Sequence, residues 1–295
     1  MVNGIINVYK EKGYTSFDVV AKLRGIFHQK KIGHTGTLDP DAEGVLPVCL
    51  GKATRVCDLL TDKDKVYKAV LLLGQETDTQ DISGQVLNQA EVNVTEQAVY
   101  DAISQFIGRQ KQVPPMYSAL KVNGKKLYEL AREGKVIERK ARDIEVFDIK
   151  VESIDLPEVT MTVHCSKGTY IRTIISDIGK KLGTGAIMTS LCRTMAAGFT
   201  LDDCHDIEAL RNIPPEDTAK LVLPTERVFS CYDEVQLDDK QKKLFMNGMI
   251  LDCGRMDISY PQGTFLRLKH GDVFVGVAKV NEENGLKSVY LNILS

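Results

Sequence analysis

Cysteine pairs, long apolar runs and common cofactor signatures are all missing from this chain of 295 residues. Its seven cysteines are odd in number and include no C-x-x-C pair. This argues against zinc sites and disulfide frameworks, and we expect reduced thiols. No glycine-rich loop ends in G-K-[ST], and no H-x-E triplet occurs. The sequence therefore excludes a P-loop and a zinc deaminase.

Membrane and export signals are missing as well. A bilayer-spanning helix needs about 18 consecutive apolar residues or more, and the sequence has no such run. The first residues, Met1 to Gly4, do not begin the charged and apolar regions of a signal peptide. We therefore expect a cytoplasmic protein without a membrane span.

Charge is nearly balanced overall, with a formal net charge of −2, but it is unevenly distributed. Residues 109–142 hold ten basic and three acidic residues, a net charge of +7. Residues 201–240 hold eleven acidic and four basic residues, a net charge of −7. Such a chain can present a basic face to phosphates although its total charge is near zero. A solvated helix with alternating charges is the competing explanation for the basic segment.

Hydrophobic periodicity predicts strands and helices without a regular βαβ repeat, which favours an α+β fold with a mixed or antiparallel sheet. Residues 159–165 alternate like a half-buried strand. Isoleucines from Ile171 onward recur at helical spacing, and Gly183 is the expected end of that helix. Ser16 is expected to cap an earlier helix that has Phe17 on its apolar face.

Breaks in this pattern predict the domain organisation. Prolines and acidic residues between 212 and 228 indicate a boundary, which gives a larger domain over residues 1–227 and a smaller, β-rich domain over residues 228–295. The basic segment at about 109–142 is expected to be an insertion in the larger domain. Within it, residues 113–126 contain two adjacent prolines and several lysines, and we expect them to form an exposed arm.

Candidate catalytic residues lie in three segments of the chain. Glycines and prolines hold His34 and Asp39 in a rigid loop beside an apolar strand. Tyr67 lies in a second strand, and Arg172 follows Ile171 about 100° around the isoleucine-rich helix. Such an arginine can reach a carboxylate at the edge of the core and keep it ionised, which suits a nucleophile. Taken singly, these residues fit ordinary structural roles better.

Taken together, the segments resemble the bacterial tRNA pseudouridine-55 synthases, the TruB family, over almost the whole chain. The departures are a Lys10-Glu11-Lys12-Gly13 motif where the family has Lys-Pro-x-Gly, which removes local stiffness, and a C-terminal part that resembles the PUA-like RNA-binding domain only loosely. The matching segments are the catalytic motif at 33–40, the second motif at 65–69 with its following loop at 74–84, the RNA-gripping insertion at 114–124, the arginine motif at 168–173 and the pocket-closing segment at 191–194.

The resemblance implies isomerisation of a uridine to pseudouridine at position 55, in the T-loop of tRNA, after base flipping and without cofactor or metal. It implies that Asp39 starts the reaction, that Arg172 pairs with Asp39, and that Tyr67 lies against the uracil as a candidate base. Whether Asp39 attacks the base, attacks the ribose or abstracts a sugar proton stays open. The remaining implied residues are His34, Tyr170, Leu191 and Lys10 for the substrate, and Lys121, Lys125 and Lys126 for the RNA backbone.

The partner implied is the T-stem-loop of tRNA, and we expect a monomer that needs no protein partner. Three alternatives stay open. The chain could be a tRNA-folding factor whose catalysis is incidental, or it could modify other RNAs with or without a guide RNA. A generic metabolic enzyme is the third, but it does not explain the segregated charge.

Overall fold

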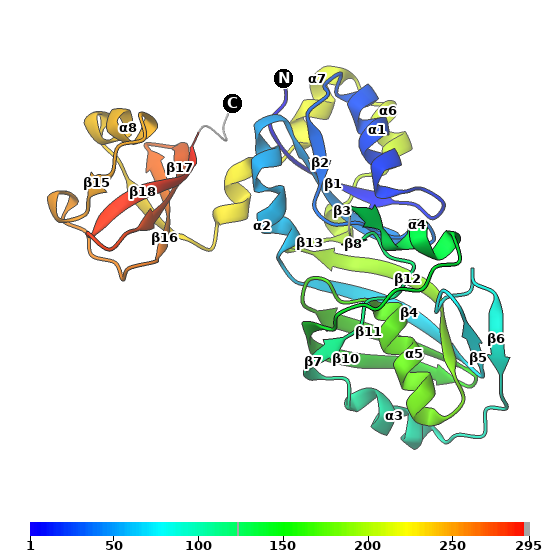
Figure 1. Cartoon of the computed structure of the whole chain (residues 1–295). Coiled ribbons are helices and arrows are strands. Elements are labelled where there is room, and N and C mark those ends of the chain that lie inside the picture. Colours follow the sequence, from blue (N-terminus) through cyan, green and yellow to red (C-terminus); the bar gives the residue numbers. More distant parts are fainter. Residues whose placement is uncertain (123, 292–295) are drawn as a thin grey trace.

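Two β-sheets organise the chain, and they lie in two lobes (Figure 1). The computed structural model describes residues 1–122 and 124–291. The larger sheet has nine strands in the order β1-β3-β12-β4-β11-β10-β7, with β2 paired to β3 and β13 paired to β12. Its strands are β1 Gly4–Lys10, β2 Ile32–His34, β3 Glu43–Leu50, β4 Lys65–Leu73, β7 Gly108–Gln112, β10 Arg142–Asp155, β11 Glu158–Cys165, β12 Ala186–Ala196 and β13 Phe199–Thr200.

Strand directions in this sheet are antiparallel except between β3 and β12. These two strands run parallel through only two residue pairs, Glu43 with Cys192 and Gly44 with Arg193. Gly44 has a φ of 106°, and a Cβ there would lie 2.3 Å from the carbonyl oxygen of Arg193. Only glycine permits this close approach of two backbones. The mixed sheet, whose strands and helices follow no regular βαβ repeat, confirms the predicted α+β class.

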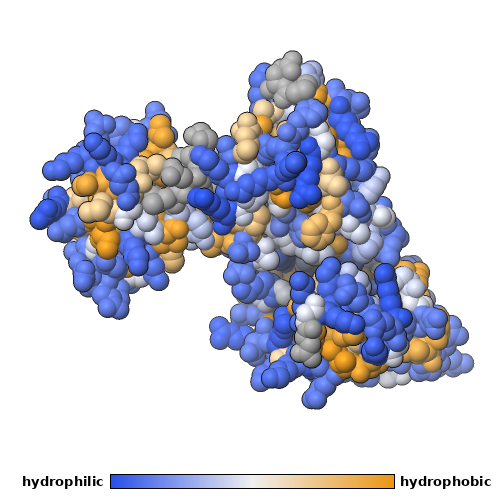
Figure 2. Space-filling model, turned by 45° about the horizontal axis from the view of Figure 1, so that its top comes forward, coloured by the Kyte–Doolittle hydropathy of each residue, from blue (hydrophilic) through white to orange (hydrophobic). Residues whose placement is uncertain are grey.

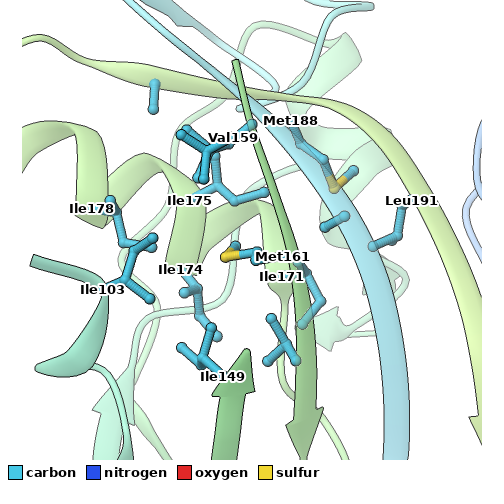
Figure 3. Packing of buried hydrophobic residues seen from close by; sticks show 14 of the residues in the cluster. Ile103, Ile149, Val159, Met161, Ile171, Ile174, Ile175, Ile178, Met188 and Leu191 are labelled. Atoms are coloured by element: carbon cyan, nitrogen blue, oxygen red, sulfur yellow. The ribbon is translucent and has the colours of Figure 1, made fainter. Parts of the chain in front are cut away.

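Helix α5 provides the core of the larger lobe. Its residues Ile171, Ile174, Ile175 and Ile178 face the sheet residues Met161, Met188 and Leu191 (Figure 3). The predicted end of this helix is confirmed, because Gly183 adopts the left-handed conformation with a φ of 74°. The helices are α1 Ser16–Ile26, α2 Cys57–Thr61, α3 Glu96–Ser104, α4 Leu127–Arg132, α5 Ile171–Leu182, α6 Ile207–Arg211, α7 Pro215–Thr218 and α8 Asp239–Met246. None of the described helices is long and apolar enough to cross a membrane.

Helix α1 differs from its prediction by one residue. Thr15, not Ser16, is the N-cap: its side chain accepts a hydrogen bond from the Asp18 N–H, and Asp18 accepts one from the Thr15 N–H. The predicted apolar face is wrong at Phe17, which is 68% exposed, whereas Val19 is buried.

Part of the basic segment, residues 109–142, is buried or lies in the main sheet, and it does not all form an exposed arm. Residues 108–112 form the edge strand β7 of the main sheet, so the excursion starts after Gln112. Pro114, Met116 and Ser118 are buried, which contradicts the prediction for this part. Only the later part of the segment projects into solvent, namely helix α4 and a small hairpin of β8 Lys121–Val122 and β9 Lys125–Lys126. Asn123, between these two strands in the sequence, lies outside the described residues.

The C-terminal lobe is a five-stranded sheet in the order β14-β16-β17-β18-β15. Phe229, Phe274 and Val277 share a hydrophobic cluster with Ile5 and Cys49 of the larger lobe. Figure 2 shows mostly hydrophilic side chains over both lobes, with hydrophobic side chains in separate patches. The remaining strands are β5 Gln75–Thr77, β6 Val86–Gln89, β14 Asp233–Gln236, β15 Leu251–Asp252, β16 Phe265–His270, β17 Val273–Val280 and β18 Gly285–Leu291, and the 3-10 helices are Gly51–Val56, Leu201–Asp203, Ala219–Leu221, Thr225–Phe229 and Gly254–Met256.

Candidate active site

A cavity of about 1080 Å³ lies between the loop of the catalytic motif at 33–40 (the catalytic-motif loop), the start of α5 and the insertion at about 109–142. Three of the residues singled out from the sequence, Asp39, Tyr67 and Tyr170, line it together. They come from positions far apart in the chain, so the cavity is assembled by the fold. Its other lining residues include Gly36, Thr61, Lys65, Arg109, Lys111, Ser118, Arg142, Lys167 and Arg193.

Arg172 holds the Asp39 carboxylate in place. Its Nη2 lies 2.9 Å from Asp39 Oδ2 and donates to the Tyr117 carbonyl oxygen at 2.8 Å. Its Nη1 lies 3.4 Å from Asp81 Oδ2. The arginine is only 5% exposed, whereas the Asp39 side chain is 43% exposed toward the cavity. One buried guanidinium thus joins two carboxylates and the insertion.

Enclosure by the cavity walls changes the acidity of Asp39. Burial is the larger effect and raises the pKa of Asp39 above its ordinary value. Arg172 opposes this rise, while the negative charge of Asp81 adds to it. The sequence predicted that the arginine keeps this aspartate ionised. In the structure Arg172 orients the carboxylate but does not hold its pKa below that of a free aspartate.

Arg193 is a central residue that the sequence reasoning did not select. It is 1% exposed, and its Nε donates to the Val45 carbonyl oxygen at 2.7 Å and its Nη2 to the Gly36 carbonyl oxygen at 3.3 Å. It is also the cross-strand partner of Tyr67 in β4. Burial raises the pKa of Tyr67, and Arg193 opposes that rise. The sequence did offer a sign of this role. Arg193 is a charged residue at a core-facing position of a strand, two residues after Leu191.

Backbone hydrogen bonds fix Tyr170 at the cavity wall. The Gln112 side chain donates to the Tyr170 carbonyl oxygen at 3.0 Å and accepts from its N–H at 2.9 Å. This pair joins edge strand β7 to the start of α5. Among the described residues, no group of three or more His, Cys, Asp or Glu side chains is arranged to hold a metal ion.

Comparison with known proteins identifies the family. The model of the TruB family pseudouridylate synthase N-terminal domain matches residues 24–171. The model of the tRNA pseudouridylate synthase B C-terminal domain matches residues 172–230. The chain belongs to the TruB family of pseudouridylate synthases.

Relatives cover nearly the whole length of this pseudouridylate synthase. The tRNA pseudouridine synthase B of Clostridium acetobutylicum is 42% identical over 291 residues, which is 98% of this chain and 99% of that protein. The protein of the same name from Lachnoclostridium phytofermentans is 53% identical over 256 residues, 84% of this chain and 83% of that protein. A similar fold occurs in the crystal structure of a Cbf5-Nop10-Gar1 complex, with a TM-score of 0.73, 27% identity and coverage of 98% of this chain and 84% of the other.

Lys10 of the pseudouridylate synthase is not placed to contact substrate, which corrects the expectation from the sequence. It is 0% exposed, and its Nζ donates to the backbone carbonyl oxygens of Glu11, Tyr14 and Pro40. All three ammonium protons therefore have partners within the protein. Burial lowers the pKa of Lys10 to about 8. Lys10 therefore connects the Lys10-Glu11-Lys12-Gly13 motif to Pro40, at the end of the catalytic-motif loop.

His34 and Leu191 also lie away from the cavity lining. His34 packs edge-on against Phe17 with ring centroids 5.3 Å apart, and its Nδ1 accepts a hydrogen bond from Gly36 N–H. Burial lowers the pKa of His34, and Arg193 lowers it further. Leu191 is buried in the cluster under α5 (Figure 3). In this structure Arg193, not Leu191, brings strand β12 to the cavity.

The three lysines expected to hold the RNA backbone lie outside the cavity lining, on the hairpin of the insertion. Lys121 and Lys125 are exposed, and Lys126 is partly exposed. Lys125 Nζ lies 3.7 Å from Glu133, and Lys126 Nζ donates to the Tyr128 hydroxyl at 3.1 Å. Exposed contacts of this kind contribute little to stability, so an RNA phosphate can replace them at small cost.

Proposed function

We propose that this pseudouridylate synthase converts the uridine at position 55, in the T-loop of tRNA, to pseudouridine. Relatives that match most of this chain carry the name tRNA pseudouridine synthase B, which supports tRNA as the substrate. The observation that carries the proposal is Asp39, exposed to a cavity, with Arg172 at 2.9 Å and Tyr67 in the same wall.

Asp39 is the catalytic residue of the proposed reaction. The glycosidic bond breaks, the uracil turns, and a carbon–carbon bond forms to the same ribose. Since reactant and product have the same composition, this isomerisation needs no second substrate and no cofactor. Asp39 acts in its ionised form, and Arg172 fixes its direction. Tyr67 lies against the uracil and Tyr170 bounds the pocket.

Flipping the uridine out of the folded T-loop costs a few kcal/mol. Contact with an aromatic side chain returns about 1–3 kcal/mol of this cost. The cavity of about 1080 Å³ exceeds the space that one nucleoside needs, so neighbouring nucleotides enter with it. The exposed Lys121, Lys125 and Lys126 then contact the backbone outside the cavity.

The C-terminal lobe acts as a PUA-like RNA-binding domain in this proposal. The domains are residues 1–227, with the insertion at about 109–142, and residues 228–295. The enzyme works in the cytoplasm as a monomer. It needs neither a guide RNA nor a protein partner, since the substrate-contacting groups of the proposal all belong to this chain.

The test is incubation of the purified protein with an unmodified tRNA transcript, followed by mapping of pseudouridine at nucleotide resolution. We expect one product at position 55. Asp39→Asn should abolish it while tRNA affinity stays within a few-fold, because the substitution keeps the side-chain shape. Asp41→Asn is the matched control: Asp41 is exposed two residues further on and does not line the cavity.

Two results would contradict the proposal. Pseudouridine formed by Asp39→Asn at a rate near that of the parent enzyme would remove Asp39 from its role. Product at another position, or product only after a guide RNA is added, would overturn the substrate assignment.

A further inference from the structure

Two cysteine thiols meet directly behind the catalytic-motif loop. Cys49, in β3, is fully buried and pairs across the sheet with Gly33 of β2. Cys57, the first residue of α2, is partly exposed, and its Sγ lies 3.6 Å from the Gly33 carbonyl oxygen. Cys49 and Gly33 are cross-strand partners, so their Cβ positions share one face of the sheet, and on that face a Cβ at Gly33 would lie 3.3 Å from Cys57 Sγ. Neither cysteine has a part in the proposed reaction.

The thiol pair lies at the base of two walls of the cavity. On one side, Gly33 leads through His34 into the loop that carries Asp39. On the other side, α2 runs for one turn from Cys57 to Thr61, which lines the cavity. Thr61 Oγ1 donates to the Cys57 carbonyl oxygen at 2.8 Å, and Lys65 donates to the Thr61 carbonyl oxygen. A shift of Cys57 therefore reaches both the loop and the Thr61–Lys65 wall.

We propose that Cys49 and Cys57 are a modification site, at which a peroxide forms a reversible disulfide that lowers the activity of the enzyme. The Cys57 thiolate attacks the peroxide, breaks the O–O bond and becomes a sulfenic acid, while the other oxygen leaves as water after taking up a proton. The Cys49 sulfur then attacks the sulfenic sulfur and expels a second water. In total, two thiols and one hydrogen peroxide give one disulfide and two waters.

Exposure and hydrogen bonding make Cys57 the residue that reacts first. Cys49 has no access to solvent, whereas Cys57 is partly exposed. The hydrogen bond from Cys49 lowers the pKa of the Cys57 thiol, which increases its thiolate fraction. A soluble dithiol reverses the reaction by thiol–disulfide exchange.

Loss of activity follows from the packing between the two sulfurs and Gly33. The two sulfurs must approach to about 2.05 Å to form a disulfide. A Cβ on Gly33 would already lie 3.3 Å from Cys57 Sγ, so little free space separates this sulfur from β2. Closing the bond therefore draws α2 against β2 and β3. A displacement of about 1 Å in a catalytic group can cost about a hundredfold in rate.

The experiment combines peptide mapping with an activity assay on the full chain. Reduced protein is treated with one equivalent of hydrogen peroxide, alkylated, and digested with trypsin without reductant. Cys49 and Cys57 fall into the separate fragments 32–52 and 56–63, because cleavage occurs after Lys31, Lys52, Arg55 and Lys63. We expect one species with the summed mass of both fragments less two hydrogens.

Activity is measured on the tRNA transcript before oxidation, after oxidation and after dithiothreitol. The reduced enzyme gives the reference rate, so a wrong substrate assignment would already appear at that step. We expect a loss of about tenfold or more on oxidation, within the range that misplaced catalytic groups produce, and full recovery with dithiothreitol. Cys57→Ser should keep its activity through the treatment, because serine can still donate to the Gly33 carbonyl.

Cys231→Ser is the matched control, since Cys231 is exposed and lies outside this pair. This variant should still form the linked fragments and lose activity. Absence of the linked fragments from peroxide-treated parent enzyme would overturn the proposal. It would equally be overturned if the linkage formed without loss of activity, or if Cys57→Ser lost activity as the parent does.

Discussion

Replacement of Arg193 by methionine is expected to separate activity from stability in this enzyme. Arg193 is 1% exposed, and within residues 1–122 and 124–291 no carboxylate lies within ion-pair distance of its guanidinium. It donates to the carbonyl oxygens of Gly36 and Val45, and Tyr67 is its cross-strand partner. It therefore links the catalytic-motif loop to Tyr67 in the wall of the cavity.

The effect on stability is the difference of two large terms. Methionine would leave two carbonyl oxygens without their donors, which costs about 1–3 kcal/mol each. It would also remove a buried charge without a carboxylate partner, and burying such a charge costs several kcal/mol. The two terms offset, so we expect the free energy of unfolding to change by about 2 kcal/mol or less. Turnover should fall about a hundredfold, because Tyr67 and Gly36 lose their common anchor.

Urea denaturation and single-turnover kinetics on the tRNA transcript test this expectation. Arg193→Lys keeps the charge but not the planar donor group, so it should recover part of the lost rate. Arg142→Met is the control, because Arg142 lines the same cavity from an exposed position. It should weaken tRNA binding while leaving single-turnover rates at saturation unchanged. A loss of stability above about 4 kcal/mol, beyond what the two offsetting terms allow, with unchanged turnover per folded molecule would show that Arg193 acts only in the core.

The charges of the molecule lead to three further predictions. Lys125→Ala combined with Lys126→Ala should reduce the salt dependence of tRNA binding by a slope of about 0.7 for each phosphate that is no longer neutralised, and an unchanged slope would argue against the hairpin as a grip. Lys10 has a pKa of about 8 in the folded protein against its ordinary value of 10.5, so the native state releases its proton first and stability should rise with pH between these values; urea denaturation of Lys10→Met should lack this rise. Asp81→Asn removes a charge that raises the pKa of Asp39, so the acid limb of turnover should move to lower pH, whereas Asp78→Asn should leave it in place.

Local pattern was sufficient for the elements that depend on local rules. The strand at 159–165, the isoleucine-rich helix and its end at Gly183 follow from residue spacing and from a left-handed glycine. The pairing of Asp39 with Arg172 was different. Helical spacing allowed an arginine to reach some carboxylate, but only the family resemblance indicated which one.

Polar burial could not be predicted, because it depends on which strands become neighbours. The family resemblance implied that Lys10 contacts the substrate, and the sequence gives no sign that the Pro40 carbonyl oxygen accepts from its ammonium group. Arg193 becomes central only because β12 lies between β3 and β4. Residue spacing in α1 also did not show that Val19 is buried in the core and Phe17 is exposed.

The buried positive charges near the site carry a cost in the free energy of folding. Lys10, Lys65 and Arg193 are buried cations held by carbonyl oxygens, and burial lowers the pKa of both lysines to about 8. Carbonyls satisfy the donors without neutralising the charge, so the positive potential remains available near Asp39. Lys10 and Arg172 both oppose the rise in the pKa of Asp39 that burial causes. If a carboxylate neutralised Lys10, the fold would lose a burial cost but Asp39 would hold its proton to higher pH. Lys10 therefore has both effects: its burial carries a cost in stability, and its charge opposes the rise in the pKa of Asp39.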